Sequence, residues 1–242
     1  MLHSTSGIIL NSIKYSESSL IVKIYTRDFG LQSYMVNGVR GKRSKQKATL
    51  FQPLALVDMQ VANSNKGGGL QRISEISIHQ PYTEIPYDIV KSSIAIFLNE
   101  ILYKALKEDH PDEDMFDFIK NSLLVLDLNH GNCANFHVFF MIQLSRFLGF
   151  YPQGKYKEET TIFDLKEGTF IRNLPSHSFF LSTKNSSLLN ELITASYETI
   201  HELKINNKER KELLQAMILF YQLHISTFKE IKSQEVLEEV IG

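Results

Sequence analysis

The first 80 residues show apolar and polar positions alternating with the period of a β-strand. In residues 19–26 (S-L-I-V-K-I-Y-T), Leu20, Val22 and Ile24 fall on one face, and such alternation is typical of a half-buried strand. Short runs of this kind, separated by turn residues, predict five strands. Their expected bounds are residues 7–13, 19–26, 31–37, 54–62 and 70–79.

The spacing of these runs favours a small barrel. Residues 27–30 (R-D-F-G) read as a tight turn, and residues 63–69 (N-S-N-K-G-G-G) as a hairpin loop. One long connection separates the third strand from the fourth. Five short strands arranged in this way suit a Greek-key barrel of the OB type. An SH3-like barrel is the main alternative.

After Pro81 and Pro86 the hydrophobic period changes from that of a strand to that of a helix. A small β-hairpin with a Lys-Glu-Gly turn is expected within this part, at residues 160–173. The fold class is therefore α+β: an OB-fold domain over residues 1–80, then a mostly helical domain over residues 81–242. The helical segments are expected at residues 87–107, 115–128, 133–150, 186–203, 207–228 and 232–240.

Charge is divided unevenly between these two parts, although the whole chain has a formal charge of only −1. Residues 1–80 hold ten Lys or Arg and four acids, a formal charge of +6, and the remainder holds 16 and 23, a charge of −7. A basic first third indicates that this part meets a polyanion. No apolar run approaches the roughly 20 residues that span a membrane, and residues 1–7 lack the features of a secretory signal.

The long connection carries five of the ten Lys and Arg residues found in residues 1–80. Residues 36–53 read V-N-G-V-R-G-K-R-S-K-Q-K-A-T-L-F-Q-P, and no acid interrupts them. Cations so close together repel one another unless something negative approaches, so they are the first candidates for contacts with nucleic acid. A solvated surface loop is the alternative. The five cations are Arg40, Lys42, Arg43, Lys45 and Lys47.

The barrel strands supply a second group of candidates, because OB barrels present aromatic and basic side chains to single strands. Tyr25, Phe29 and Tyr34 are the aromatic residues that could stack on bases, although each alone is better explained as a core or ordinary surface residue, so they rank below the basic connection. Four cations could flank them: Lys14, Lys23, Arg27 and Arg72.

Sites for catalysis, metal binding or nucleotide binding are not indicated. Cys133 and His137 lie four apart on one apolar helix, but two ligands do not make a metal site, and a buried thiol and a core histidine explain them better. The acidic turn at residues 109–114 fits a solvated helix cap, and no nucleophile elbow or phosphate-binding loop is present. We therefore expect a non-enzyme without a cofactor. Cys133 is the only cysteine, which excludes an intrachain disulfide and fits a reducing cytoplasm.

Four segments together resemble RecO, a family of bacterial recombination and repair mediators of the RecF pathway. They are G-I-I-L-N-S-I-K-Y-S-E-S-S-L-I-V-K-I-Y-T near the start, F-G-L-Q-S-Y-M-V-N-G-V-R-G-K-R-S leading into the basic connection, L-S-R-F-L-G-F-Y-P at the end of the aromatic helix, and L-L-Q-A-M-I-L-F-Y-Q-L-H followed by K-S-Q-E-V-L near the C-terminus. The resemblance covers essentially the whole chain. Their order and spacing carry it, because no single segment is diagnostic.

The resemblance implies a cytoplasmic protein, associated with the nucleoid during repair, that binds single- and double-stranded DNA and anneals complementary strands. It also implies partnership with RecR and with the single-stranded DNA-binding protein, so that RecA is loaded. The C-terminal tail of the latter would dock on the aromatic helix, where Arg146 is the one cation; a helix-end charge favourable to the helix dipole is its alternative. The competing function is a protein-interaction adaptor whose basic loop binds an acidic protein.

One departure from the family concerns zinc. Many RecO proteins carry four cysteines just after the aromatic helix, whereas residues 154–182 contain none and offer only His177. Because a structural zinc site needs about four thiolate or imidazole ligands, we predict well under one zinc per chain. Elemental analysis of protein purified without chelator measures this, and a value near one would reveal ligands gathered from distant positions.

Overall fold

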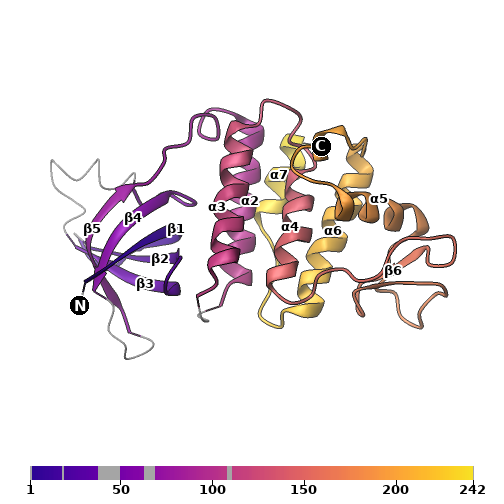
Figure 1. Ribbon diagram of the computed structural model, residues 1–242, viewed down its shortest axis with the longest axis horizontal. Coiled ribbons are helices and arrows are strands. Elements are labelled where there is room, and N and C mark those ends of the chain that lie inside the picture. The colour runs from indigo at the N-terminus through magenta and orange to yellow at the C-terminus, as the bar shows by residue number, and fades with distance from the viewer. Residues whose placement is uncertain (1, 18, 38–49, 63–68, 108–110, 242) are drawn as a thin grey trace. The chain divides into compact units, whose positions relative to one another are not determined.

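The computed structural model describes residues 2–17, 19–37, 50–62, 69–107 and 111–241. Five strands close a barrel in the order β1-β2-β3-β5-β4 (Figure 1). The strands are β1 (Leu2–Lys14), β2 (Leu20–Thr26), β3 (Gly30–Val36), β4 (Leu56–Ala62) and β5 (Gln71–Ile78). Each predicted strand is present, and β1 begins five residues earlier than expected.

The pairing of the strands identifies the barrel type. Neighbouring strands are antiparallel except β3 and β5, which pair in parallel through Tyr34 with Gln71 and Met35 with Arg72. The fifth strand therefore lies between the third and the fourth, as in a closed Greek-key barrel of the OB type. This confirms the predicted fold of the N-terminal part over its SH3-like alternative.

Alternation along the strands builds the barrel core. In β4, Val57, Met59 and Val61 are buried while Asp58 and Gln60 between them are exposed, the pattern of a strand with one face inward. These residues and six others form one apolar cluster. The complete cluster is Ile9, Val22, Ile24, Tyr34, Val36, Phe51, Val57, Met59 and Val61.

The outer face of β1, β2 and β3 is also buried. Ile8, Tyr25 and Leu31 pair across the three strands, and each is at most 2% exposed, yet none belongs to the barrel core. Tyr25 shows what covers this face: its ring lies 6.1 Å from that of Phe116 in helix α3 (Glu113–Leu128). This part of α3 belongs to the same compact unit as the barrel, which comprises residues 1–83 and 99–124.

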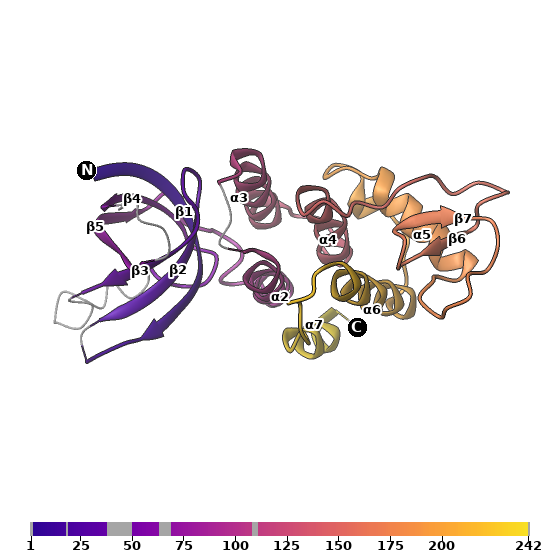
Figure 2. The ribbon, with the colours of Figure 1, turned by 90° about the horizontal axis from the view of Figure 1, so that it is seen from below.

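The second compact unit comprises residues 84–98 and 125–242. Helix α2 (Ile89–Ala105) contributes its first turns, and α4, α5 and α6 pack on one another (Figures 1 and 2). The further helices are α4 (Phe136–Phe147), α5 (Thr183–Thr194), the 3-10 turn η1 (Ile200–Glu202), α6 (Asn207–His224) and α7 (Ser233–Ile241). None of the helices in the described ranges is long and apolar enough to cross a membrane.

Helix α4 is the centre of this unit. Nine of its 12 residues are buried, which explains why its sequence carries more aromatic residues than one helix face requires. The helix is shorter than the predicted segment 133–150, because Cys133–Asn135 lie in a turn before it and Gly149 has a left-handed backbone (φ +85°) after it.

The small hairpin, β6 (Ile162–Asp164) with β7 (Thr169–Ile171), packs beside α5 (Figure 2). The buried Asp164 carboxylate accepts the backbone N–H groups of Lys166 and Glu167 and lies 3.3 Å from His177 Nε2. The ring of Phe163 contacts Phe170 and Phe220. Turn capping and aromatic packing thus hold the hairpin together. Among the described residues no three His, Cys, Asp or Glu side chains gather as metal ligands would.

Candidate nucleic-acid interface

Four strands meet at one rim of the barrel. Register places Lys14 of β1 opposite Leu20 of β2, Leu20 opposite Val36 of β3, and Met35 of β3 beside Arg72 of β5. The connection 15–19, the start of the long basic connection and the end of the connection 63–70 are therefore on the same rim. In OB folds, loops at these positions and the face of strands 2 and 3 bind oligonucleotides.

The predicted basic residues Arg40, Lys42, Arg43, Lys45 and Lys47 lie outside the described residues. The described residues show where the connection that carries these cations begins. Asn37 directly follows β3, and its side-chain oxygen accepts a 2.9 Å hydrogen bond from the Ser19 hydroxyl. The β1–β2 turn and the start of the basic connection are therefore tied together at this rim.

Exposed side chains at the same rim have the chemistry of a single-strand binding surface. Lys14 and Arg72 are exposed, and the ring of Tyr15 is 62% exposed at the tip of the β1–β2 hairpin, beside Ile13. An exposed aromatic ring beside a cation offers a base a stacking partner. Tyr15 was not among the candidates taken from the sequence. The available signal was its place in a polar turn, Y-S-E-S-S.

Arg27, a predicted DNA contact, lies at the opposite rim and is already engaged. Its guanidinium is 3.0 Å from Glu113 and 3.1 Å from Asp117, both on α3. Beside it, the Tyr25 hydroxyl donates to the Asp112 carbonyl at 3.3 Å, and burial raises the pKa of Tyr25, with a smaller contribution from the Asp112 charge. Acidic residues of the chain itself occupy the place where a phosphate would have to bind.

Lys23 is also engaged by the chain. It lies on the outer face of β2, half buried, with its ammonium 5.7 Å from the centre of the Tyr103 ring of α2. A lysine held over an aromatic face gains a cation–π interaction. Lys23 therefore faces a helix of its own compact unit, whereas Arg72 does face outward at the open rim.

The prediction that Tyr34 stacks on DNA bases is wrong. Its ring is in the barrel core with 0% exposure, and burial raises its pKa to about 12. No base can reach this ring in the folded barrel. Tyr25 is excluded for the same reason, at 2% exposure, whereas Phe29 keeps partial exposure.

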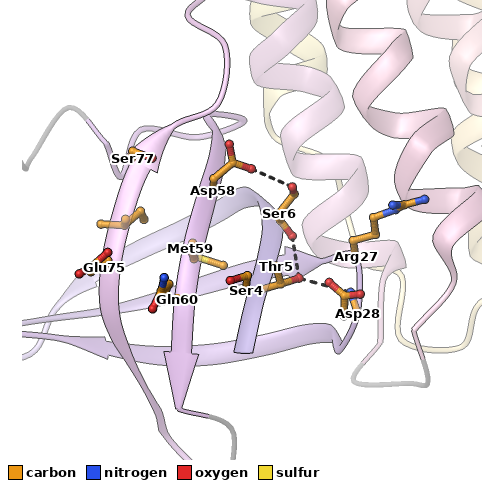
Figure 3. A pocket seen from close by; sticks show the side chains of 11 residues that line it. Ser4, Thr5, Ser6, Arg27, Asp28, Asp58, Met59, Gln60, Glu75 and Ser77 are labelled. Atoms are coloured by element: carbon orange, nitrogen blue, oxygen red, sulfur yellow. Dashed lines mark hydrogen bonds between the residues drawn. The ribbon is translucent and has the colours of Figure 1, made fainter. Parts of the chain in front are cut away.

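A hollow of about 520 Å³ on the outer face of β1, β4 and β5 has the wrong charge for nucleic acid (Figure 3). Hydroxyl groups and the carboxylates of Asp28, Asp58 and Glu75 line it. Arg27 belongs to its lining, but its guanidinium turns away toward α3 (Figure 3). Three carboxylates would repel a phosphate backbone.

Asp58 remains ionised at neutral pH. Burial pushes the pKa of this carboxyl upward, but hydrogen bonds from His79 and Ser6 outweigh burial and leave the pKa below its usual value. The two hydrogen bonds are 2.9 Å and 2.8 Å long. The negative charge of the hollow is therefore a stable feature, and it leaves the rim with Lys14, Tyr15 and Arg72 as the candidate interface.

Arg146, the predicted partner-binding residue, lies at the C-terminal end of α4. It is exposed, and its guanidinium stands 4.5 Å from the centre of the Tyr151 ring. The aromatic residues of α4 that were expected to line a groove beside it are mostly buried within the unit. At the C-terminal end of α4, Arg146 and Tyr151 are the side chains available for contact with a partner.

Comparisons with known proteins cover both parts of the chain. A family model described as Recombination protein O N terminal matches residues 1–82, and one described as Recombination protein O C terminal matches residues 86–234. The DNA repair protein RecO of Phocaeicola vulgatus is 38% identical over 242 residues, which is 100% of each chain. Proteins with the same description from Bacteroides fragilis (38%, 99% of each chain) and Flavobacterium psychrophilum (37%, 98% of each chain) match similarly.

The N-terminal family match ends at residue 82 and the C-terminal match begins at residue 86. The two compact units do not divide the chain at a single point, because residues 84–98 belong to the second unit and residues 99–124 to the first. The domain boundary expected between residues 80 and 81 stays a prediction.

The ion pairs of Arg27 lead to a stability prediction. Replacing Arg27 by Gln should lower the free energy of unfolding by about 0.5–1 kcal/mol at low salt, because two partly exposed carboxylates lose their partner. High salt should reduce the difference, since it screens exposed charges. Urea unfolding at both salt concentrations measures it. Arg72→Gln is the matched control and should have almost no effect; equal losses in the two variants would contradict the assignment.

Proposed function

Since the chain belongs to the RecO family of DNA repair proteins, we propose that it is a DNA-binding mediator of recombination and repair. It binds single- and double-stranded DNA, anneals complementary strands, and helps RecR to load RecA on DNA coated by the single-stranded DNA-binding protein. It acts in the cytoplasm, associated with the nucleoid during repair, as a binding protein rather than an enzyme.

The observation that carries this proposal is the convergence at one barrel rim. The described part of that rim exposes Lys14, Tyr15 and Arg72, and the connection with five cations leaves β3 there. Cations neutralise phosphates without reading sequence, and an aromatic ring stacks on any base. This combination supports binding with little sequence preference, which a protein that acts on any damaged site requires.

Annealing follows from the same chemistry. Two complementary strands repel each other through their phosphates, and a surface that neutralises several phosphates on each strand lowers that repulsion. Residues 40–47 hold five cations and no acid. We expect these cations to bring the second strand to one already held at the rim.

The basic residues are tested by replacing Lys42, Arg43 and Lys45 together by Glu. If three to five phosphate contacts form in the wild type, log affinity for single strands should fall against log salt with a slope of about −2 to −3.5. The triple variant should bind every sequence more weakly and flatten that slope by about 2. Annealing of complementary oligonucleotides should fall in parallel.

The matched control makes the same charge change elsewhere, at the exposed Lys155, Lys157 and Lys166 of the second unit. Both triple variants should keep the wild-type melting temperature, because solvated charges contribute within about 0.5 kcal/mol. A basic-loop variant with wild-type affinity and salt slope would refute the DNA contact. It would favour the alternative function, an adaptor whose basic loop binds an acidic protein.

Tyr15 is tested separately because its contribution does not depend on charge. Stacking on an aromatic side chain contributes about 1–3 kcal/mol per base, so Tyr15→Ala should weaken single-strand binding by roughly five- to 150-fold and leave the salt slope unchanged. Tyr87, which is 87% exposed, provides the control substitution Tyr87→Ala. Equal affinities of the two variants would exclude Tyr15 from the interface.

The partner site proposed at Arg146 rests on the exposure of this side chain and on the neighbouring Tyr151 ring. A cation beside a partly exposed aromatic ring suits the acidic, apolar C-terminal tail of the single-stranded DNA-binding protein. Arg146→Glu should reduce the anisotropy change of a labelled tail peptide, whereas Arg172→Glu, at another exposed arginine, should not. Unchanged affinity would remove Arg146, and no binding by the wild type would remove the site.

A further inference from the structure

The second unit contains a hollow of about 290 Å³ that the proposed function does not use. It lies between the first turns of α6, the start of α4 and the end of α7. Its lining includes the charged residues Lys208, Arg210, Lys211 and Glu238, the apolar Leu214 and Ile241, and His137. These side chains combine charge, apolar surface and an unusual buried imidazole.

Arg210 is a buried cation with no carboxylate partner among the described residues. Its side chain is 8% exposed and donates four hydrogen bonds, all to neutral oxygen atoms. The acceptors are Asn135 Oδ1, Asn207 Oδ1 and the carbonyls of Ile205 and Ile241. A guanidinium has five N–H donors, so one N–H of Nη2 has no partner among the described residues. Burial lowers the pKa of Arg210, as expected for a charge that the surrounding residues do not neutralise.

His137 lines the same hollow, and its ring interacts only weakly with the backbone of Ala134. It is 0% exposed, and in the described part of the chain neither ring nitrogen has a partner in good hydrogen-bond geometry. Burial, assisted by the charge of Arg210, lowers its pKa to about 3, so the ring is neutral at physiological pH. Buried polar atoms nearly always find partners. The His137 ring is therefore a polar group at the wall of the hollow whose hydrogen-bonding capacity the described residues leave largely unused.

The surrounding charges select an anion. Lys208 and Lys211 follow Asn207 on the first turns of α6, where the positive end of the helix dipole lies. The one acidic residue of the lining, Glu238, is paired with Lys211 at 2.7 Å and hydrogen-bonded by Gln234. Arg210 and Lys208 are thus left with a positive charge that the lining does not balance.

We propose that this hollow binds a small organic anion. Its carboxylate or phosphate group meets Arg210 and Lys208, and its apolar part lies against Leu214 and Ile241. The volume is near the lower limit of known ligand pockets, so the ligand is smaller than a nucleotide. Because the lining comes from α6 and α7 together, the ligand would join the C-terminal helix to the rest of the unit.

The test uses the full chain and three probes at constant ionic strength: inorganic phosphate, acetate and benzoate. Ring signals of His137 in NMR spectra report binding. We expect saturable shifts with phosphate and benzoate, and tighter binding of benzoate than of acetate because of the apolar walls. Lys208→Gln should weaken binding about two- to fivefold, as for a partly exposed ion pair. The exposed Lys204, outside the lining, supplies the control Lys204→Gln, which should bind like the wild type.

A second variant fills the hollow without touching its charges. Ile241→Trp, at the half-exposed end of α7, should abolish the shifts. If this variant fails to fold, the comparison of Lys208→Gln with Lys204→Gln still tests the proposal. Shifts that do not saturate in the wild type, or equal weakening in Lys208→Gln and Lys204→Gln, would overturn the proposal and leave only a general effect of anions.

Discussion

The burial of the outer face of β1, β2 and β3 is the constraint on which the rest of the first unit depends. Tyr25 packs on Phe116 and donates to the Asp112 carbonyl, while Arg27 joins Glu113 and Asp117. A surface that many OB folds leave to their ligand is here part of the internal packing. If the barrel binds nucleic acid, as we propose, the opposite rim is the surface that remains for it.

Acidic and basic side chains are also divided between the two ends of the barrel. Acidic side chains of α3 face Arg27 at one end of the barrel, and three carboxylate side chains line the hollow on β1, β4 and β5. At the other end Lys14 and Arg72 are exposed, and the stretch with five cations begins just beyond β3. Acidic surfaces repel phosphate and basic ones attract it, so under the proposed function a strand that approaches the barrel would be directed to one end. Binding of this kind requires no base-specific contact.

The sequence predicted the five strands, the barrel and the helical part, because alternation and helical spacing are local signals. It could not predict the contacts of a single side chain whose partners lie far away in the sequence. Arg27 and Lys23 were chosen as free cations, but their partners lie about 80 to 90 residues away in α2 and α3. Tyr34 was named as a stacking candidate because alternation defines two faces without telling which one turns inward. Tyr15 was not named, although its place in the polar turn Y-S-E-S-S indicated exposure.

Site-specific photo-crosslinking to a single-stranded oligonucleotide tests whether the rim with Lys14, Tyr15 and Arg72 contacts DNA. A photoreactive phenylalanine analogue is placed in turn at Tyr15, at Arg72 on the same rim, and at Ser77 in the acidic hollow. We expect cross-links from positions 15 and 72, which should disappear at high salt, and none from position 77. Cross-links from position 77 with none from the rim would contradict it.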